Sequence, residues 1–254
     1  VLRLTTRPMP APRAREAGIR VAYAGVKRPD ALQRAVRRTL RWHHLLRGGS
    51  TERLSVEEQR GLVGELQVLQ LLCAEIGAEA AIEAWRGPED GAKDFELDGM
   101  CMEVKARRGA AKPQVQISSS DQLADVASAD VFLLVHDVDA AIKPDGMTLA
   151  DHVQLVEDIF QSSTLTAYGT WERLLAATGF DWLHDYNDRR WTVGKRAVFR
   201  VEDGFPRIPS PVPIGVMNVK YSVALDACAA FSVEDDELLL EIKKTQSSKN
   251  YDGV

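Results

Sequence analysis

The sequence predicts an α/β fold built around a mixed sheet, and three stretches of the chain carry this prediction. Residues 55–77 have helical periodicity, residues 94–105 form two short runs around Asp98-Gly99, and residues 129–138 are an almost unbroken apolar run. They indicate, in order, an amphipathic helix, a β-hairpin and a buried central strand. A central strand that is apolar throughout is typical of a sheet covered on both faces.

Residues 55–77 predict a helix with a defined start and end. Ser55 and Glu58 match the capping-box pattern, and Gly77 suits the position that follows a helix C-terminus. Glu65 lies within an apolar stripe formed by Leu62, Leu69, Leu72 and Ile76. An acid among leucines is costly unless it is paired or bound to a metal. The alternative is that this acid sits at the edge of the stripe and reaches water.

Residues 94–105 predict a hairpin, because an Asp-Gly pair between alternating residues favours a type I′ turn with positive φ at both positions. If Asp98 and Gly99 are the loop residues, Asp94 lies directly opposite Glu103. Side chains alternate between the faces of a strand, so one face of the hairpin is apolar. The other face carries Asp94, Glu96, Cys101, Glu103 and Lys105.

Two neighbouring acids on one face need a compensating cation. Lys105 shares the face of Asp94 and Glu103 and supplies part of the positive charge. A hard divalent metal with oxygen ligands would supply the rest. The ordinary alternative is a solvated polar face on an amphipathic hairpin.

The remaining elements are predicted from local patterns. Strands are expected at 18–25, 78–85, 114–119, 190–201 and 215–225, and helices at 29–47, 121–128, 148–160 and 166–179, with a final short element at 233–242. The change in character near residue 147 suggests four regions. These are a basic N-terminal arm and helix (1–50), a core (51–146), an α+β C-terminal region (147–242) and a polar tail (243–254).

Composition narrows the class of protein. The chain has 254 residues, of which 45% are apolar and 27% charged, and no apolar run is long enough to predict a membrane span. Three cysteines without a CxxC pair, and no recognisable signal peptide, predict free thiols in a reducing cytoplasm. The common ATP, dinucleotide, zinc-protease and esterase motifs do not occur in the sequence.

Charge is distributed unevenly along the chain. Residues 1–50 contain 12 Lys or Arg and 2 acids, a net charge of +10, whereas the whole chain carries −5. The rest of the chain is therefore close to −15. A basic arm predicts a polyanionic partner such as DNA, and docking of the arm on the acidic remainder is an equally good interpretation.

The hairpin residues resemble the PD-(D/E)XK nuclease motif, because Asp94 is followed after eight residues by Glu103-Val104-Lys105. Asp90 is the alternative motif acid since it lies nearer a proline, but only Asp94 sits opposite Glu103 in the expected register. On the neighbouring helices, Glu65 is similar to the extra acid, and Gln122 to the polar residue, that many of these nucleases carry.

Residues 50 to 240, which include WERLL, FPRI and VKYSVALDAC, resemble a PD-(D/E)XK family of unknown function. Its members are often encoded in bacterial restriction and phage-defence cassettes. The resemblance implies a restriction-endonuclease-like core with the order α-β-β-β-α-β and an α+β C-terminal portion. It also implies hydrolysis of DNA phosphodiester bonds with Mg²⁺, for which Mn²⁺ is expected to substitute.

The resemblance also implies roles for named residues. Asp94 and Glu103, with the Val104 carbonyl, are expected to hold the metal, and Lys105 to serve the attacking water. Glu65 is expected to hold a water or a second metal. Contacts to the DNA backbone are expected from Arg107, Arg108 and Lys112, although an ordinary surface loop explains these three equally well.

Several alternatives and partners follow. A catalytically silent DNA-binding or scaffolding subunit of a defence complex is the main alternative, and an RNA-directed or DNA-repair nuclease would use the same core chemistry. An ATPase, helicase or methyltransferase subunit is an expected partner, because the sequence has no ATP motif of its own. A homodimer would supply the two sites that a double-strand cut requires, and no membrane partner is expected.

Overall fold

The computed structural model describes residues 52–89 and 91–247. The basic arm with its expected strand (18–25) and helix (29–47), the alternative motif acid Asp90, and the end of the polar tail lie outside these residues. The described residues belong to one compact unit.

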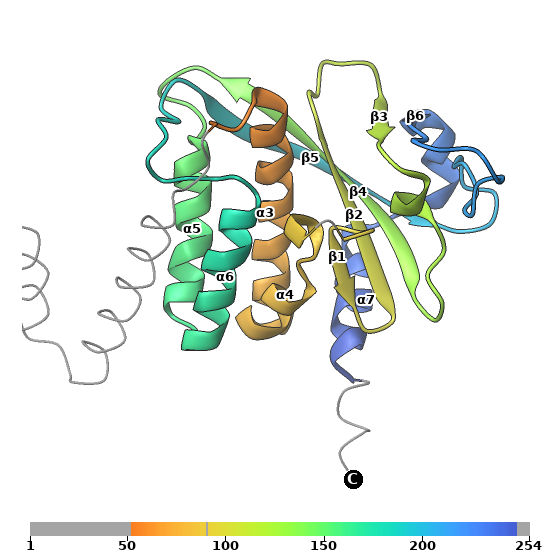
Figure 1. The fold of residues 1–254 in the computed structure, drawn as a ribbon, viewed down its shortest axis with the longest axis horizontal. Helices are drawn as coiled ribbons and strands as arrows, with labels where there is room; N and C mark the ends of the chain where they lie inside the picture. The colour runs from red at the N-terminus through yellow and green to blue at the C-terminus, as the bar shows by residue number, and fades with distance from the viewer. Residues whose placement is uncertain (1–51, 90, 248–254) are drawn as a thin grey trace, which may run out of the picture. The chain divides into compact units, whose positions relative to one another are not determined.

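A five-stranded mixed sheet forms the centre of this unit, as predicted (Figure 1). Its strands, in spatial order, are β1 (Phe95–Leu97), β2 (Met100–Arg107), β4 (Asp130–Ala141), β5 (Arg190–Val201) and β7 (Ser232–Val233). The β2–β4 pair is parallel and the other neighbouring pairs are antiparallel. The apolar run that predicted a central strand is β4, which is paired on both edges and buried over most of its length.

Helices cover one face of the sheet (Figure 1). They are α3 (Val56–Ile76), α4 (Ala78–Ala84), α5 (Leu149–Gln161), α6 (Leu165–Ala177) and α7 (Asp235–Ser247). The capping boxes of α3 and α5 form as their sequences specify, at Ser55 and Thr148. None of the helices within the described ranges combines the length and the apolarity that crossing a bilayer requires.

A smaller layer covers the other face of the sheet. It consists of a two-stranded sheet, β3 (Gln114–Ile117) with β6 (Tyr221–Ala224), and the 3-10 helices η2 (Ser120–Leu123) and η3 (Leu225–Phe231). Together with the central strands it encloses a second apolar cluster that contains Cys101 and Leu133. The central strands are therefore buried on both faces over most of their length, and β2 is buried from Met100 to Val104 and partly buried from there to Arg107.

Four local predictions were wrong. Residues 78–85 form α4 instead of a strand, because the run of Ala and Glu has high helix propensity. Residues 121–128 form only η2, and the strand expected at 215–225 is limited to β6. The predicted tail begins inside α7, which continues to Ser247.

The sheet draws strands from both sides of residue 147, since β4 pairs with β5 along almost its whole length. The division into a core at 51–146 and an α+β region at 147–242 stays a prediction about domains. The elements α3, β1, β2, β3, η2 and β4 follow the predicted α-β-β-β-α-β order, with a 3-10 helix in the place of the second helix and with α4 and the 3-10 helix Gly87–Glu89 inserted between α3 and β1.

Candidate active site

The hairpin has the predicted register, and this register brings the candidate residues together. Phe95 pairs with Met102 and Leu97 with Met100, so Asp94 comes next to Glu103. The predicted turn type was wrong. Among the described residues only Gly99 of the two loop positions has a positive φ (73°), whereas a type I′ turn requires one at Asp98 as well.

Both the side chain and the backbone carbonyl of Asp94 accept hydrogen bonds. Its Oδ2 accepts a hydrogen bond from the Val104 backbone N–H at 2.7 Å. Its own carbonyl oxygen accepts from the N–H groups of Arg86 (2.8 Å) and Gly87 (3.0 Å). Burial raises the pKa of the Asp94 carboxyl, and the bond from Val104 opposes this effect. The bond from Val104 therefore holds the carboxyl group against β2.

Glu103 and Lys105 form an ion pair inside the protein. The Lys105 Nζ lies 2.6 Å from Glu103 Oε1, and Glu103 is only 1% exposed. Burial, followed by the neighbouring charge of Asp94, raises the pKa of Glu103 to about 8, although Lys105 acts in the opposite direction. The solvated face considered as the alternative does not exist at this position.

Gln122 completes this side of the site. Its Oε1 accepts hydrogen bonds from Lys105 Nζ at 3.1 Å and from the Ser118 backbone N–H at 2.8 Å. Gln122 belongs to η2, whose preceding residue Ser119 accepts a bond from the Asp121 N–H. The amide therefore links the Lys105 ammonium to the segment after β3.

Glu65 reaches the same place from α3. Its Oε2 accepts a hydrogen bond from the Trp85 indole N–H at 2.8 Å. A Cβ built on Gly87 would lie 2.9 Å from Asp94 Oδ1 and 3.0 Å from Glu65 Oε2, so both carboxyl groups converge on one point. Burial and then the charge of Asp94 raise the pKa of Glu65 to about 8, against the effect of the Trp85 bond.

Close packing of α3 on β2 sets the position of Glu65. A Cβ at Gly64 would lie 3.1 Å from the Ala106 Cβ, which is tighter than almost all real contacts of this kind. The neighbouring glycine on the helix, Gly61, has nothing within 4 Å of its Cβ position. Only Gly64 is needed for the close approach.

Two residues at the site were missed by sequence reasoning. Lys93 is 1% exposed, and its Nζ donates to the carbonyl oxygens of Asp121 and Ala124, the latter at 3.0 Å. It therefore ties the residue before Asp94 to the segment that carries Gln122. Trp85 supplies the donor to Glu65. A buried indole N–H usually has a partner, but its pairing with a residue 20 positions away leaves no local signal.

Of the expected DNA-contacting residues, Arg107 ends β2, and Arg108 and Lys112 lie in the loop between β2 and β3. The Arg107 guanidinium lies 2.5 Å from Asp137 Oδ1 and donates to the carbonyl of Ala111 at 2.7 Å. It therefore links the loop after β2 to the neighbouring strand β4. Arg108 and Lys112 are exposed. Contact of these residues with DNA stays a prediction.

The donor set suits a hard cation. Within residues 52–89 and 91–247, no group of three or more His, Cys, Asp or Glu side chains is arranged to hold a metal ion. Mg²⁺ does not need such a cage, because it keeps several waters and binds through one or two carboxylates together with substrate phosphates. Asp94, Glu65 and Glu103 offer oxygen ligands only, and a cation would stabilise their ionised forms. These residues fit the metal that the sequence resemblance implies.

The mixed sheet, the helix α3 packed on it and the acid–lysine hairpin define a restriction-endonuclease-like fold. The model of a family described as "Putative PD-(D/E)XK family member" (DUF4420) matches residues 20–226, and the chain belongs to this family. The match confirms the resemblance found in the sequence. Comparison with the curated proteins and with the solved structures gave no match.

Proposed function

We propose that the chain is a Mg²⁺-dependent endodeoxyribonuclease that acts in restriction of foreign DNA or in defence against phage. The observation that supports this most directly is the Glu103–Lys105 ion pair on the hairpin where Val104 binds Asp94, with Glu65 converging on Asp94. Membership in a PD-(D/E)XK family agrees with hydrolysis of a phosphodiester.

The metal would be held by Asp94 and Glu103, with the Val104 carbonyl as a further ligand and with Mn²⁺ able to replace Mg²⁺. When bound, it would lower the pKa of water and neutralise charge on the phosphate oxygens. Glu65 would hold a water or a second ion. Because Val104 already donates its N–H to Asp94, the strand and the acid are fixed to each other before any ligand binds.

Lys105 is the group that would serve the attacking water. Its ammonium lies between Glu103 and the Gln122 amide oxygen, so two acceptors define its position. An amine at this point can orient the water, accept its proton when neutral, and stabilise the charge that develops on the phosphate. Gln122 would keep Lys105 in place when Glu103 turns to a metal.

A plasmid-cleavage assay in Mg²⁺ and in EDTA tests the proposal. Cleavage is expected in Mg²⁺ only, and Asp94→Ala and Lys105→Ala are expected to abolish it without unfolding the chain. Glu96→Gln is the matched control, because Glu96 is an exposed acid on the same strand face and has no contact with the candidate site. Cleavage by the Asp94→Ala chain at the normal rate would contradict the site.

A catalytically silent DNA-binding subunit is the second candidate. The observation that favours it is the closed Glu103–Lys105 ion pair, since it occupies a carboxyl oxygen that a metal would need. A chain that shifts DNA in a gel but does not cleave it in Mg²⁺ or Mn²⁺ would identify this role. Repeating the assay with RNA and with damaged or modified DNA separates restriction from repair and RNA processing.

Partners belong to the proposal as well. Any ATP-driven translocation would come from a separate ATPase or helicase subunit, and a methyltransferase subunit would protect host DNA. A homodimer would place two sites on opposite strands. Sedimentation of the chain with and without duplex DNA reports whether it pairs.

A further inference from the structure

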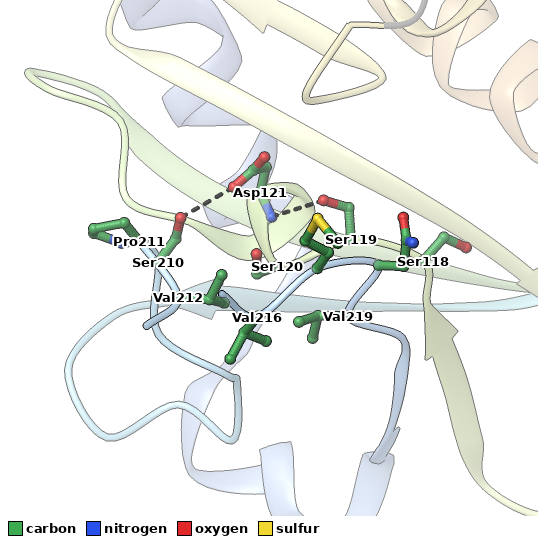
Figure 2. A pocket seen from close by; sticks show the side chains of 11 residues that line it. Ser118, Ser119, Ser120, Asp121, Ser210, Pro211, Val212, Val216 and Val219 are labelled. Atoms are coloured by element: carbon green, nitrogen blue, oxygen red, sulfur yellow. Dashed lines mark hydrogen bonds between the residues drawn. The ribbon is translucent and has the colours of Figure 1, made fainter. Parts of the chain in front are cut away.

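A pocket of about 360 Å³ lies beside the candidate active site. Residues 118–121, which follow β3 and include the start of η2, form one wall, and segments of the 210–219 loop form the other (Figure 2). This volume is at the small end of the range for ligand pockets in proteins. The pocket is therefore sized for one small group rather than for an extended ligand.

A short chain of hydrogen bonds joins the pocket to Lys105. The Ser118 backbone N–H donates to Gln122 Oε1, and the same oxygen accepts from Lys105 Nζ. Ser118 lines the pocket. The Gln122 side chain would therefore separate a group bound beside Ser118 from the Lys105 ammonium, which we place at the phosphate.

The two walls are fixed to each other. The Arg207 guanidinium donates to the Leu123 carbonyl and lies 2.6 Å from Asp125 Oδ1. Ser210 Oγ donates to Asp121 Oδ1 at 3.0 Å, as the dashed line in Figure 2 shows. These bonds hold the start of the 210–219 loop against η2, so the pocket exists before a ligand enters.

The lining combines apolar and hydrogen-bonding groups. Apolar side chains come from the loop at Val212, Val216, Met217 and Val219, and hydroxyl and amide groups come from Ser118, Ser119, Ser120, Ser210 and Asn218. Asp121 is the one ionisable side chain among the described lining residues. A lone carboxylate disfavours a phosphate, whereas a neutral ring with polar edges suits such a mixture.

Apolar side chains are exposed at the outer side of the loop. Ile214 is fully exposed and Met217 is 80% exposed, next to a pocket that Met217 also lines. Isoleucine and methionine are among the residues that DNA-bending proteins insert between base steps to unstack them. Exposed wedge residues beside a base-sized pocket fit an extruded base better than a phosphate backbone.

We propose that this pocket receives one nucleobase turned out of the DNA, while the tip of the 210–219 loop fills the space left in the stack. The proposal rests on the proposed function, because it takes DNA as the substrate. Asp121 would accept a hydrogen bond from an exocyclic amino group, as carboxylates do with cytosine N4. Bases that carry an amino group are therefore expected to bind in preference to thymine.

Fluorescence of 2-aminopurine tests the proposal. The probe is a DNA duplex with one 2-aminopurine opposite an abasic site, where extrusion costs least. The protein is the full chain with Asp94→Asn, a change that is expected to prevent cleavage. Because none of the described lining residues is aromatic, the extruded base leaves its stacked neighbours without gaining new ones. Binding should raise the fluorescence several-fold.

Two further variants show where the base goes. Val216→Trp, made in the Asp94→Asn chain, fills the pocket and should remove the fluorescence rise while DNA binding, measured by anisotropy, persists. Ile142→Trp is the matched control, because Ile142 is 87% exposed and lies outside the pocket. It should leave the rise unchanged.

Each result decides the proposal. The proposal is overturned if DNA binds without a rise in fluorescence, or if the rise survives Val216→Trp. It is also overturned if the chain binds no DNA and uses the loop for a protein partner. Plasmid cleavage by the unaltered chain separately reports the proposed function. Cleavage without a rise removes only the base pocket, and a rise without cleavage removes only the nuclease activity.

Discussion

At the scale of single residues, three carboxyl groups share one small volume, and their surroundings explain how they coexist. Each has a raised pKa because burial disfavours the ionised form, and Glu65 and Glu103 reach about 8. One lysine, one indole N–H and the Val104 backbone N–H supply the nearby donors. These donors compensate only part of the negative charge of the three carboxylates. A bound cation would therefore stabilise the site, since opposite charge favours the ionised forms.

Lys93 is expected to act as a support of the site. Lys93→Met would remove a donor from the carbonyl oxygens of Asp121 and Ala124, of which Asp121 keeps only the Ala124 N–H, at a cost of about 1–3 kcal/mol in the free energy of unfolding. Urea denaturation measures this loss. Lys195→Met is the control, because Lys195 is exposed and should change stability little. Equal stability of the two variants would contradict the supporting role.

His136 predicts a fall in stability at acidic pH. Burial, followed by the charge of Arg196, lowers the pKa of His136 from 6.5 to about 4. The unfolded chain therefore binds a proton at a higher pH than the folded chain does. A tenfold change in proton affinity is worth about 1.4 kcal/mol. The folded state should consequently lose roughly 3 kcal/mol from this residue as the pH falls from 6.5 through 4.

Thermal unfolding at several pH values isolates this effect when the unaltered chain is compared with the His136→Gln variant. The variant does not titrate at this position, so its stability should depend less steeply on pH between 4 and 6.5. Parallel curves for the two proteins would show that His136 carries no proton linkage.

At the scale of elements, the contact of α3 with β2 is expected to control the site. Gly64→Val would force side-chain atoms against Ala106 and displace the turn that carries Glu65, at a cost of about 1–3 kcal/mol for overpacking. Gly61→Ala is the matched control on the same helix. It meets nothing within 4 Å and should stabilise the chain by about 0.5–1 kcal/mol.

Urea unfolding of both variants gives the sign of each change, and plasmid cleavage gives its effect on the site. The Gly64→Val chain should lose cleavage at temperatures where it is still folded, whereas Gly61→Ala should keep it. A Gly64→Val chain as stable as the unaltered one would contradict the close packing.

The elements that could be predicted are those whose signals are local. The capping box at Ser55, the hairpin register around Gly99 and the apolar run of β4 depend on residues near one another in the chain. Residues 78–85 show the limit of this reasoning. Their alternating pattern also fits a short helix, and the preference of Ala and Glu for helix decided the outcome.

The candidate site, like the fold, was predictable where its signals are local in the sequence. Counting outward from the turn placed Asp94 beside Glu103, because alternation along a strand is strict. The partners that complete the site come from distant segments. Trp85 reaches Glu65, and Lys93 reaches residues 28 and 31 positions further along the chain. Such contacts follow from tertiary packing and leave no pattern in the sequence.

At the scale of the whole described unit, the second layer formed by β3, β6, η2 and η3 decides the character of the site. It buries the face of β2 that carries Glu103 and Lys105, and it supplies Gln122. The same layer and the 210–219 loop that precedes β6 form the walls of the pocket. Chemistry and substrate selection are therefore expected to depend on one small structural layer.

Metal binding should stabilise the folded chain as a whole, because the carboxyl groups lie close together only in the folded state. A ligand present at 100 times its dissociation constant adds about 2.7 kcal/mol to the free energy of unfolding. The melting temperature should thus rise with Mg²⁺ or Mn²⁺ and return to its starting value with EDTA. Asp94→Asn should abolish the rise and Glu96→Gln should preserve it. A rise that persists in the Asp94→Asn chain would place the cation elsewhere, because a neutral amide at this position removes the charge that attracts it.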